Sequence, residues 1–215
     1  MFNKIFPKLH AEGYKFIVIA IISTIVFYNF SSFLGLIGLV LSIWVYYFFR
    51  DPERIIIHDD NYLVSPADGE VIKVEEVDGP KELGLESKKF NKISIFMNIF
   101  DCHVNRTPCR GQVEEILYKP GKFFNASLDK ASEDNERNYY KIKDTHGNDV
   151  VVVQIAGLIA RRIVCETNKM QNLKQGERIG MIRFGSRADV YYENYEPLVK
   201  IGQRAISGET LLAKK

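Results

Sequence analysis

The residues with the clearest chemical potential lie near the C-terminal end of the chain, between two stretches that alternate like β-strands. The first stretch, 178–184, is followed by Gly185 and Ser186, and the second stretch is 188–192. In one interpretation Gly185 marks a β-bulge or a tight turn. In the other, the Ser186 hydroxyl attacks the Gly185 carbonyl carbon and converts the peptide bond into an ester. Backbone strain and the missing side chain of Gly185 both favour this second reaction.

A serine nucleophile needs a general base, and one of the four histidines is well placed to serve. His103 follows a predicted buried strand, which could aim its ring into a site. Asp68, at the head of a neighbouring predicted strand, is the candidate carboxylate to orient His103. The other histidines lie before a long apolar segment, in the linker after it and in a predicted turn: His10, His58 and His146.

Both partners of Ser186 also have an ordinary structural interpretation. His103 can be a hydrogen-bonded histidine of the core, and Asp68 lies in the turn sequence 65–69, where aspartate is a common turn former. The spacing of Asp68, His103 and Ser186 along the chain does not show that they meet.

Composition divides the chain into an apolar segment and a mixed remainder. The 34 residues from Phe16 to Phe49 carry no charge, whereas charge is frequent after Arg50. The net charge of +2 gives no indication of nucleic-acid binding. The three cysteines are an odd number without CxxC spacing, so we expect free thiols in a reducing compartment and no metal site.

We expect residues 1–50 to form a membrane anchor, a hairpin of two short helices at about 14–30 and 33–49. One straight helix of 34 residues would be roughly 50 Å long, against a hydrocarbon core of roughly 30 Å. Basic residues flank both ends of the segment, which places them at the cytoplasmic face of the cell (inner) membrane. A single tilted span is the alternative. A cleaved signal peptide fits poorly, because the run is too long and no small-residue cleavage site follows.

The remainder, residues 51–215, alternates in strand-like stretches and shows no long helical periodicity. Predicted strands include 70–77, 92–99, 111–117 and 150–156. We therefore expect a single mainly β domain, of sandwich or barrel type.

Ser186, His103 and Asp68 suit more than one function. A membrane-anchored serine hydrolase acting on lipids is one hypothesis, although the residues around Ser186 do not form a GxSxG elbow. A self-processing enzyme is another: its ester would break by β-elimination to dehydroalanine, and hydrolysis would release ammonia and leave a pyruvoyl group. That ketone can take a substrate amine as a Schiff base and promote decarboxylation, as pyridoxal phosphate does. A β domain that only binds lipid or a partner is the third hypothesis.

Six blocks of this sequence resemble the short-form phosphatidylserine decarboxylase proenzymes, in the same order, over roughly residues 61–215. The blocks are 65–69 (SPADG), 96–98 (FMN) leading into 103–106 (HVNR), 120–123 (PGKF) with 125–126 (NA), 135–137 (NER), 154–157 (QIAG) with 160–163 (ARRI), and 180–187 (GMIRFGSR).

The resemblance implies a mainly β fold and decarboxylation of phosphatidylserine to phosphatidylethanolamine in phospholipid biosynthesis. It also implies autocatalytic cleavage at Gly185–Ser186 and a covalent pyruvoyl group made from Ser186, with no metal and no pyridoxal phosphate. Residues 1–185 and 186–215 would stay together as the β and α chains of a heterodimer. The substrate would be a phospholipid in the membrane, with no nucleic acid involved.

Four basic residues are candidates to meet the phosphate of that lipid, although the ordinary interpretation of each one is a solvated surface charge. They are Lys119, Lys122, Arg161 and Arg162.

The chain departs from the long-form relatives in two places. Arg106 stands where they have a second histidine, three residues after the first, and the cleavage sequence is Phe-Gly-Ser-Arg rather than Leu-Gly-Ser-Thr. If the long form divides the proton transfers between its two histidines, His103 must serve both self-cleavage and decarboxylation here, or another group must help.

Overall fold

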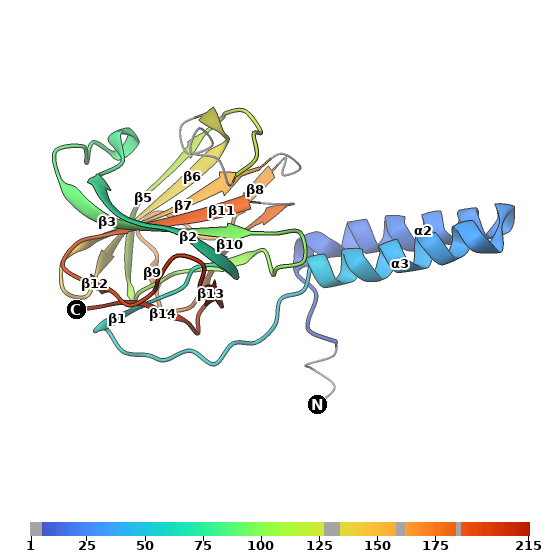
Figure 1. Ribbon diagram of the computed structural model, residues 1–215, viewed down its shortest axis with the longest axis horizontal. Coiled ribbons are helices and arrows are strands. Elements are labelled where there is room, and N and C mark those ends of the chain that lie inside the picture. Colours follow the sequence, from blue (N-terminus) through green and yellow to red (C-terminus); the bar gives the residue numbers. More distant parts are fainter. Residues whose placement is uncertain (1–5, 127–133, 158–161, 184–185) are drawn as a thin grey trace. The chain divides into compact units, whose positions relative to one another are not determined.

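A computed structural model describes residues 6–126, 134–157, 162–183 and 186–215. The chain separates into two compact units, Met1–Glu53 and Arg54–Lys215. The first unit is helical and the second is built almost entirely of strands (Figure 1). The predicted fold class, a mainly β domain preceded by a hydrophobic helical hairpin, is confirmed.

The helical unit is a hairpin of α2 (Tyr14–Phe30) and α3 (Ser32–Phe48), preceded by the short 3-10 helix η1 (Ala11–Gly13). Ser31 separates the two helices with extended backbone, and its Oγ accepts a hydrogen bond from Phe33 N at 3.3 Å, so it caps α3.

The two helices pack closely through small side chains. A Cβ added at Gly38 would lie 2.9 Å from Thr24 Oγ1, and one added at Gly35 would lie 2.7 Å from the Tyr28 ring. Thr24 Oγ1 also lies 2.9 Å from Ser42 Oγ on the facing helix. Small residues at such a contact let two backbones approach.

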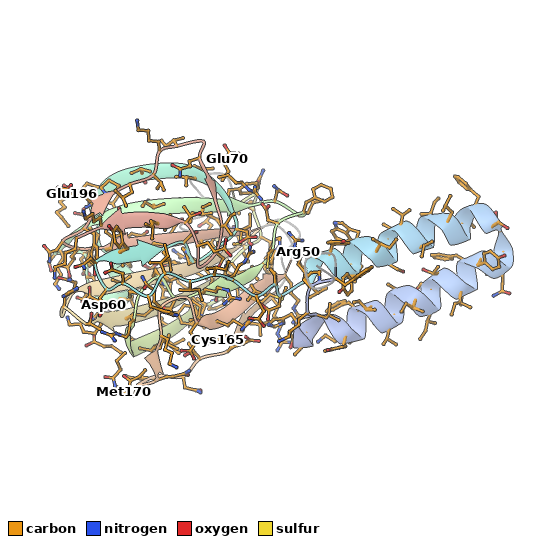
Figure 2. All side chains as sticks on the ribbon, turned by 90° about the horizontal axis from the view of Figure 1, so that it is seen from below. Arg50, Asp60, Glu70, Cys165, Met170 and Glu196 are labelled. Atoms are coloured by element: carbon orange, nitrogen blue, oxygen red, sulfur yellow. The ribbon has the colours of Figure 1, made fainter. Side chains whose placement is uncertain are left out.

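Apolar side chains project outward along both helices (Figure 2). Within the described residues, Ala11–Phe30 is the one helix that is long and apolar enough to cross a membrane, and Ser32–Phe48 is shorter.

The second unit contains an eight-stranded antiparallel sheet that curls into a half-barrel. Figure 1 draws β2, β3, β11, β7, β6 and β5 side by side as one twisted layer. In spatial order the strands are β13 (Arg204–Ala205), β2 (Gly69–Asp78), β3 (Lys89–Met97), β11 (Ser186–Tyr192), β7 (Asp149–Ala156), β6 (Arg137–Asp144), β5 (Gly111–Lys119) and β9 (Asn172–Leu173).

Two three-stranded sheets accompany it, and a short 3-10 helix, η2 (Lys81–Leu83), joins β2 to β3. One small sheet has the order β4 (Val104–Arg106), β10 (Arg178–Arg183), β8 (Arg162–Cys165). The other has the order β1 (Tyr62–Val64), β14 (Leu211–Lys214), β12 (Glu196–Pro197).

Both faces of the large sheet are packed, because alternate residues of each strand enter different apolar clusters. On β11, Ala188, Val190 and Tyr192 belong to the main core, whereas Tyr191 packs against a second cluster that contains Phe90 and Val153. We call the face that carries Ala188, Val190 and Tyr192 the core face, and the face that carries Tyr191 the outer face. Ser186 has the parity of Ala188 and therefore lies on the core face.

Candidate active site

Ser186 is the first residue of β11, in the middle of the large sheet. It lies opposite Met97 at the end of β3 and Ala156 at the end of β7, and it is fully buried. Its Oγ lies 3.9 Å from Met97 Sδ. The preceding strand, β10, ends at Arg183 in a different sheet, so the chain passes from one sheet to the other immediately before Ser186. Gly185, the other half of the predicted cleavage site, lies outside the described residues.

His103 is held beside the strand that leads to Ser186. It is fully buried and directly precedes β4, and its carbonyl oxygen accepts a hydrogen bond from Ile182 N of β10 at 3.2 Å. Its Nδ1 lies 3.0 Å from the Asp101 carbonyl oxygen. If Nδ1 carries the proton and donates it to that oxygen, Nε2 is the nitrogen that can accept a proton, as a general base requires.

The turn that carries His103 is fixed by Asp101, a residue that the sequence did not single out. The buried Asp101 carboxylate accepts a hydrogen bond from Asn98 N at 2.8 Å and pairs with the Arg204 guanidinium. These contacts set the direction in which the chain enters His103.

Asp68 lies just before β2 and is also buried. Arg54 Nη2 donates to its Oδ2 at 2.6 Å, and Ser207 N donates to its Oδ1 at 2.8 Å. Each carboxylate oxygen therefore has a donor of its own. The hypothesis that Asp68 orients His103 stays a prediction.

A buried chain of amide and hydroxyl groups touches the Ser186 site, and sequence reasoning missed it. Asn105 Nδ2 donates to the Met97 sulfur at 3.6 Å, while Gln154 Nε2 donates to Asn105 Oδ1 at 2.8 Å. The Tyr140 hydroxyl lies 2.8 Å from Gln154 Oε1 and 3.0 Å from the Ile179 carbonyl oxygen. Burial raises the pKa of Tyr140 well above its ordinary value, so its hydroxyl keeps its proton.

Because buried polar groups are costly without partners, this network holds its members in one arrangement. The sequence held one signal of this network, because Gln154 is a polar residue within the otherwise apolar run 150–156.

A second missed feature lies on the outer face of β11. Arg187 and Asp189 form a fully buried, two-pronged ion pair, with Nε to Oδ1 and Nη2 to Oδ2 both at 2.7 Å. Arg187 Nη1 also donates to the Ala126 carbonyl oxygen at 3.4 Å. Side chains two residues apart on a strand lie on the same face, so the spacing of Arg187 and Asp189 was the sequence signal of this pair.

Three of the four candidate phosphate ligands lie within the described residues. Lys119 ends β5 and pairs with Glu82 at 2.9 Å. Lys122 is largely exposed and lies 3.8 Å from an Asp134 oxygen. Arg162 is exposed at the start of β8, and Arg161 lies outside the described residues. Among the residues that the structure describes, no three His, Cys, Asp or Glu side chains gather as a metal site would require.

A serine that is buried between two strands suits attack on its own backbone better than attack on an external ester. The fold and the site therefore point to the class of self-processing β proenzymes. The chain belongs to the phosphatidylserine decarboxylase family, whose family model, "Phosphatidylserine decarboxylase", matches residues 41–213.

Three similar proteins are each described as a phosphatidylserine decarboxylase proenzyme. The protein of Pelagibacter ubique is 79% identical over 215 residues, which is 100% of both chains. That of Ruegeria pomeroyi is 52% identical over 95% of this chain and 94% of its own. That of Cereibacter sphaeroides is 51% identical over 99% of this chain and 92% of its own.

Proposed function

We propose that Ser186 is the residue from which this enzyme makes its prosthetic group, and that the chain is cut between Gly185 and Ser186. The chain decarboxylates phosphatidylserine to phosphatidylethanolamine after processing of a proenzyme. Its family depends on a pyruvoyl group formed from a serine of the proenzyme. The observation that carries the assignment is the position of Ser186, buried at the head of a central strand directly after the passage between two sheets.

The surroundings of Ser186 fit a pyruvoyl group. The Met97 sulfur, which lies 3.9 Å from Oγ, is an uncharged neighbour that does not react with a ketone. From Arg187 onward, β11 pairs with β3 on one side and β7 on the other. The new chain end at residue 186 is therefore held in place after cleavage. Such a group supplies a ketone that accepts the substrate amine and the electrons released when carbon dioxide leaves.

In the proposed self-cleavage, His103 takes the proton from Ser186 Oγ as the oxygen attacks the Gly185 carbonyl carbon. An ester C–O bond forms, the peptide C–N bond breaks, and the proton passes to the nitrogen of residue 186. In the hypothesis Asp68 keeps the His103 ring oriented. In the later decarboxylation, His103 protonates the substrate carbon that has lost carbon dioxide.

The two fragments are proposed to remain a heterodimer of a β chain, 1–185, and an α chain, 186–215. Three strands of the shorter fragment are paired with strands of the longer one: β11 with β3 and β7, β13 with β2, and β14 with β1. A 30-residue piece cannot bury a core of its own, so these ladders are what keep it folded.

The substrate head group is proposed to meet exposed basic residues. Lys122 and Arg162 suit this role because both are accessible to a ligand from solvent. A cation within hydrogen-bond reach of a phosphate oxygen stabilises the bound lipid. Replacing either residue by alanine should raise KM for phosphatidylserine in mixed micelles; an unchanged KM would remove it from the lipid site.

We place the catalytic domain at the cytoplasmic face of the membrane, since Lys8 and Lys15 precede the apolar segment and Arg50 follows it. Cys165, labelled in Figure 2, is an exposed free thiol and reports the location. A maleimide that cannot cross membranes should leave it unlabelled in intact spheroplasts and label it after lysis. Labelling in intact spheroplasts would place the domain on the other side.

The cleavage assignment is tested by Ser186→Ala, which should leave one full-length chain without decarboxylase activity. Ser94→Ala is the matched control, because Ser94 is equally buried on the adjacent strand β3 but lies on the outer face, and its hydroxyl has no hydrogen-bond partner within the described residues. That variant should be cleaved normally. A cleaved Ser186→Ala protein would refute the assignment.

A further inference from the structure

The outer face of the large sheet carries a cavity of about 270 Å³. Its lining includes Tyr191 and Asp189 of β11, which have the opposite parity to Ser186, so the cavity lies behind the catalytic strand rather than in the Ser186 site. The η2 segment forms its other wall. Its charged lining residues are Lys81, Glu82, Lys92, Lys119, Arg137 and Asp189.

Each carboxylate that lines this cavity forms an ion pair with a cation of the protein. Glu82 lies 2.9 Å from Lys119 Nζ and 3.3 Å from Arg137 Nη2. Burial alone would raise the pKa of Glu82, but the hydrogen bond from Lys119 and the charge of Arg137 outweigh it, and the pKa is lowered. Asp189 is paired on both oxygens by Arg187. Glu82 is therefore anionic at neutral pH, and each of the two carboxylates is paired with a cation.

Cations outnumber these carboxylates. Lys92 Nζ pairs with Glu75, just outside the lining, at 2.6 Å. Counting that pair and Arg187, the described residues place five cations beside three carboxylates, an excess of two positive charges. The cations are Lys81, Lys92, Lys119, Arg137 and Arg187, and the carboxylates are Glu75, Glu82 and Asp189.

Two of these five cations are poorly hydrated, whereas Lys81 is exposed. The side chain of Arg137 is only 5% exposed and that of Lys92 only 10%. In such a site a cation interacts with an anion more strongly than it would in water. Two tyrosines, Tyr139 and Tyr191, also line the cavity, and burial raises the pKa of both, so their hydroxyls keep their protons.

We propose that this cavity binds a small phosphate-bearing anion. Two excess positive charges match a phosphomonoester dianion, and the guanidinium and ammonium groups are the donors that phosphate oxygens prefer. The volume lies just below the roughly 300 Å³ at which pockets for drug-sized ligands begin, so it suits a head group rather than a lipid tail. The site goes beyond the decarboxylation and does not depend on the assignment of Ser186.

The test uses full-length Ser186→Ala protein in nonionic detergent, so that no ketone reacts with the ligands. Isothermal titration is carried out with inorganic phosphate in one arm. In a second arm the titrant is short-chain phosphatidic acid in mixed micelles, with phosphatidylcholine as the comparison lipid. Saturable binding in the first arm identifies a soluble phosphate ligand. Binding of phosphatidic acid alone identifies a lipid head group of the same chemistry.

Two substitutions tie binding to the cavity. Lys92→Met removes a mostly buried cation of the lining, and Lys81→Ala removes an exposed one. Each should weaken binding about tenfold, the effect of one lost charge-assisted hydrogen bond. Lys89→Met, on the same strand as Lys92 but outside the cavity, should leave affinity unchanged. Failure of both ligands to bind would overturn the proposal, and so would Lys81 and Lys92 variants that bind as tightly as the parent protein.

Discussion

Replacing Gln154 by methionine tests whether the buried network beside Ser186 depends on its central amide. Gln154 is fully buried, and methionine keeps its length and unbranched shape while removing the donor to Asn105 and the acceptor for Tyr140. The Tyr140 hydroxyl still has the Ile179 carbonyl oxygen at 3.0 Å, so its donor stays satisfied. Asn105 Oδ1 loses the hydrogen bond that it accepts from Gln154. The expected cost is therefore that of one orphaned buried acceptor, about 1–3 kcal/mol.

The assay is urea unfolding of the single-chain Ser186→Ala protein in detergent, followed by far-UV circular dichroism. With a slope of about 2 kcal/mol per molar urea, the midpoint should fall by about 0.5–1.5 M. Gln112→Met is the control, because the Gln112 amide makes one exposed hydrogen bond of 3.4 Å, and its midpoint should move little. A Gln154→Met midpoint equal to that of the control would refute the reasoning. With Ser186 intact, the same substitution should also slow cleavage, since Asn105 contacts the Met97 sulfur.

Two further predictions concern His103 and the acid limit of stability. His103→Ala should slow self-cleavage in a gel time course, carbon dioxide release from phosphatidylserine, or both, whereas the exposed His146→Ala should slow neither. A His103 variant with normal rates would remove the proposed base from the mechanism. Burial would raise the pKa of Asp149, but hydrogen bonds from Lys88 and Lys143 prevail and lower it to about 2. Because this folded-state pKa lies below the unfolded value of about 3.9, Asp149 contributes about 2 kcal/mol above pH 5, which is lost as the pH falls towards 2. Asp149→Asn should therefore flatten the decline in unfolding free energy between pH 5 and pH 2, and an unchanged decline would contradict the assignment.

Helices and strands were predictable from the sequence wherever a stretch of residues followed a single hydrophobic periodicity. The expected helices at 14–30 and 33–49 correspond to Tyr14–Phe30 and Ser32–Phe48. The expected strand 150–156 corresponds to Asp149–Ala156. In these stretches the apolar pattern and the burial agree, because each element buries the side chains that its own sequence marks.

The boundary of β11 was wrong by two residues, for a physical reason. Ser186 and Arg187 were expected in the interruption before a strand starting at Ala188, yet β11 begins at Ser186. Local composition places a polar pair in a turn, but the ladders with Met97 and Ala156 extend the strand to include it. Tertiary pairing here outweighs local preference.

The contacts within the site could not be predicted, because they depend on register between strands far apart in the chain. Asn105 and Gln154 are 49 positions apart and meet only once β4 faces the large sheet. The resemblance blocks contained both residues without indicating that they touch. The Arg187–Asp189 pair was detectable in principle from its spacing, but its complete burial was not.

The central claim is tested most directly by the intact mass of the shorter fragment from the purified mature enzyme. A 30-residue piece is expected, residues 186–215, lighter by one ammonia than the same peptide with an N-terminal serine, and gaining two hydrogens on borohydride reduction. A single chain of full-length mass, or a fragment that begins with an ordinary serine amine, would contradict the account.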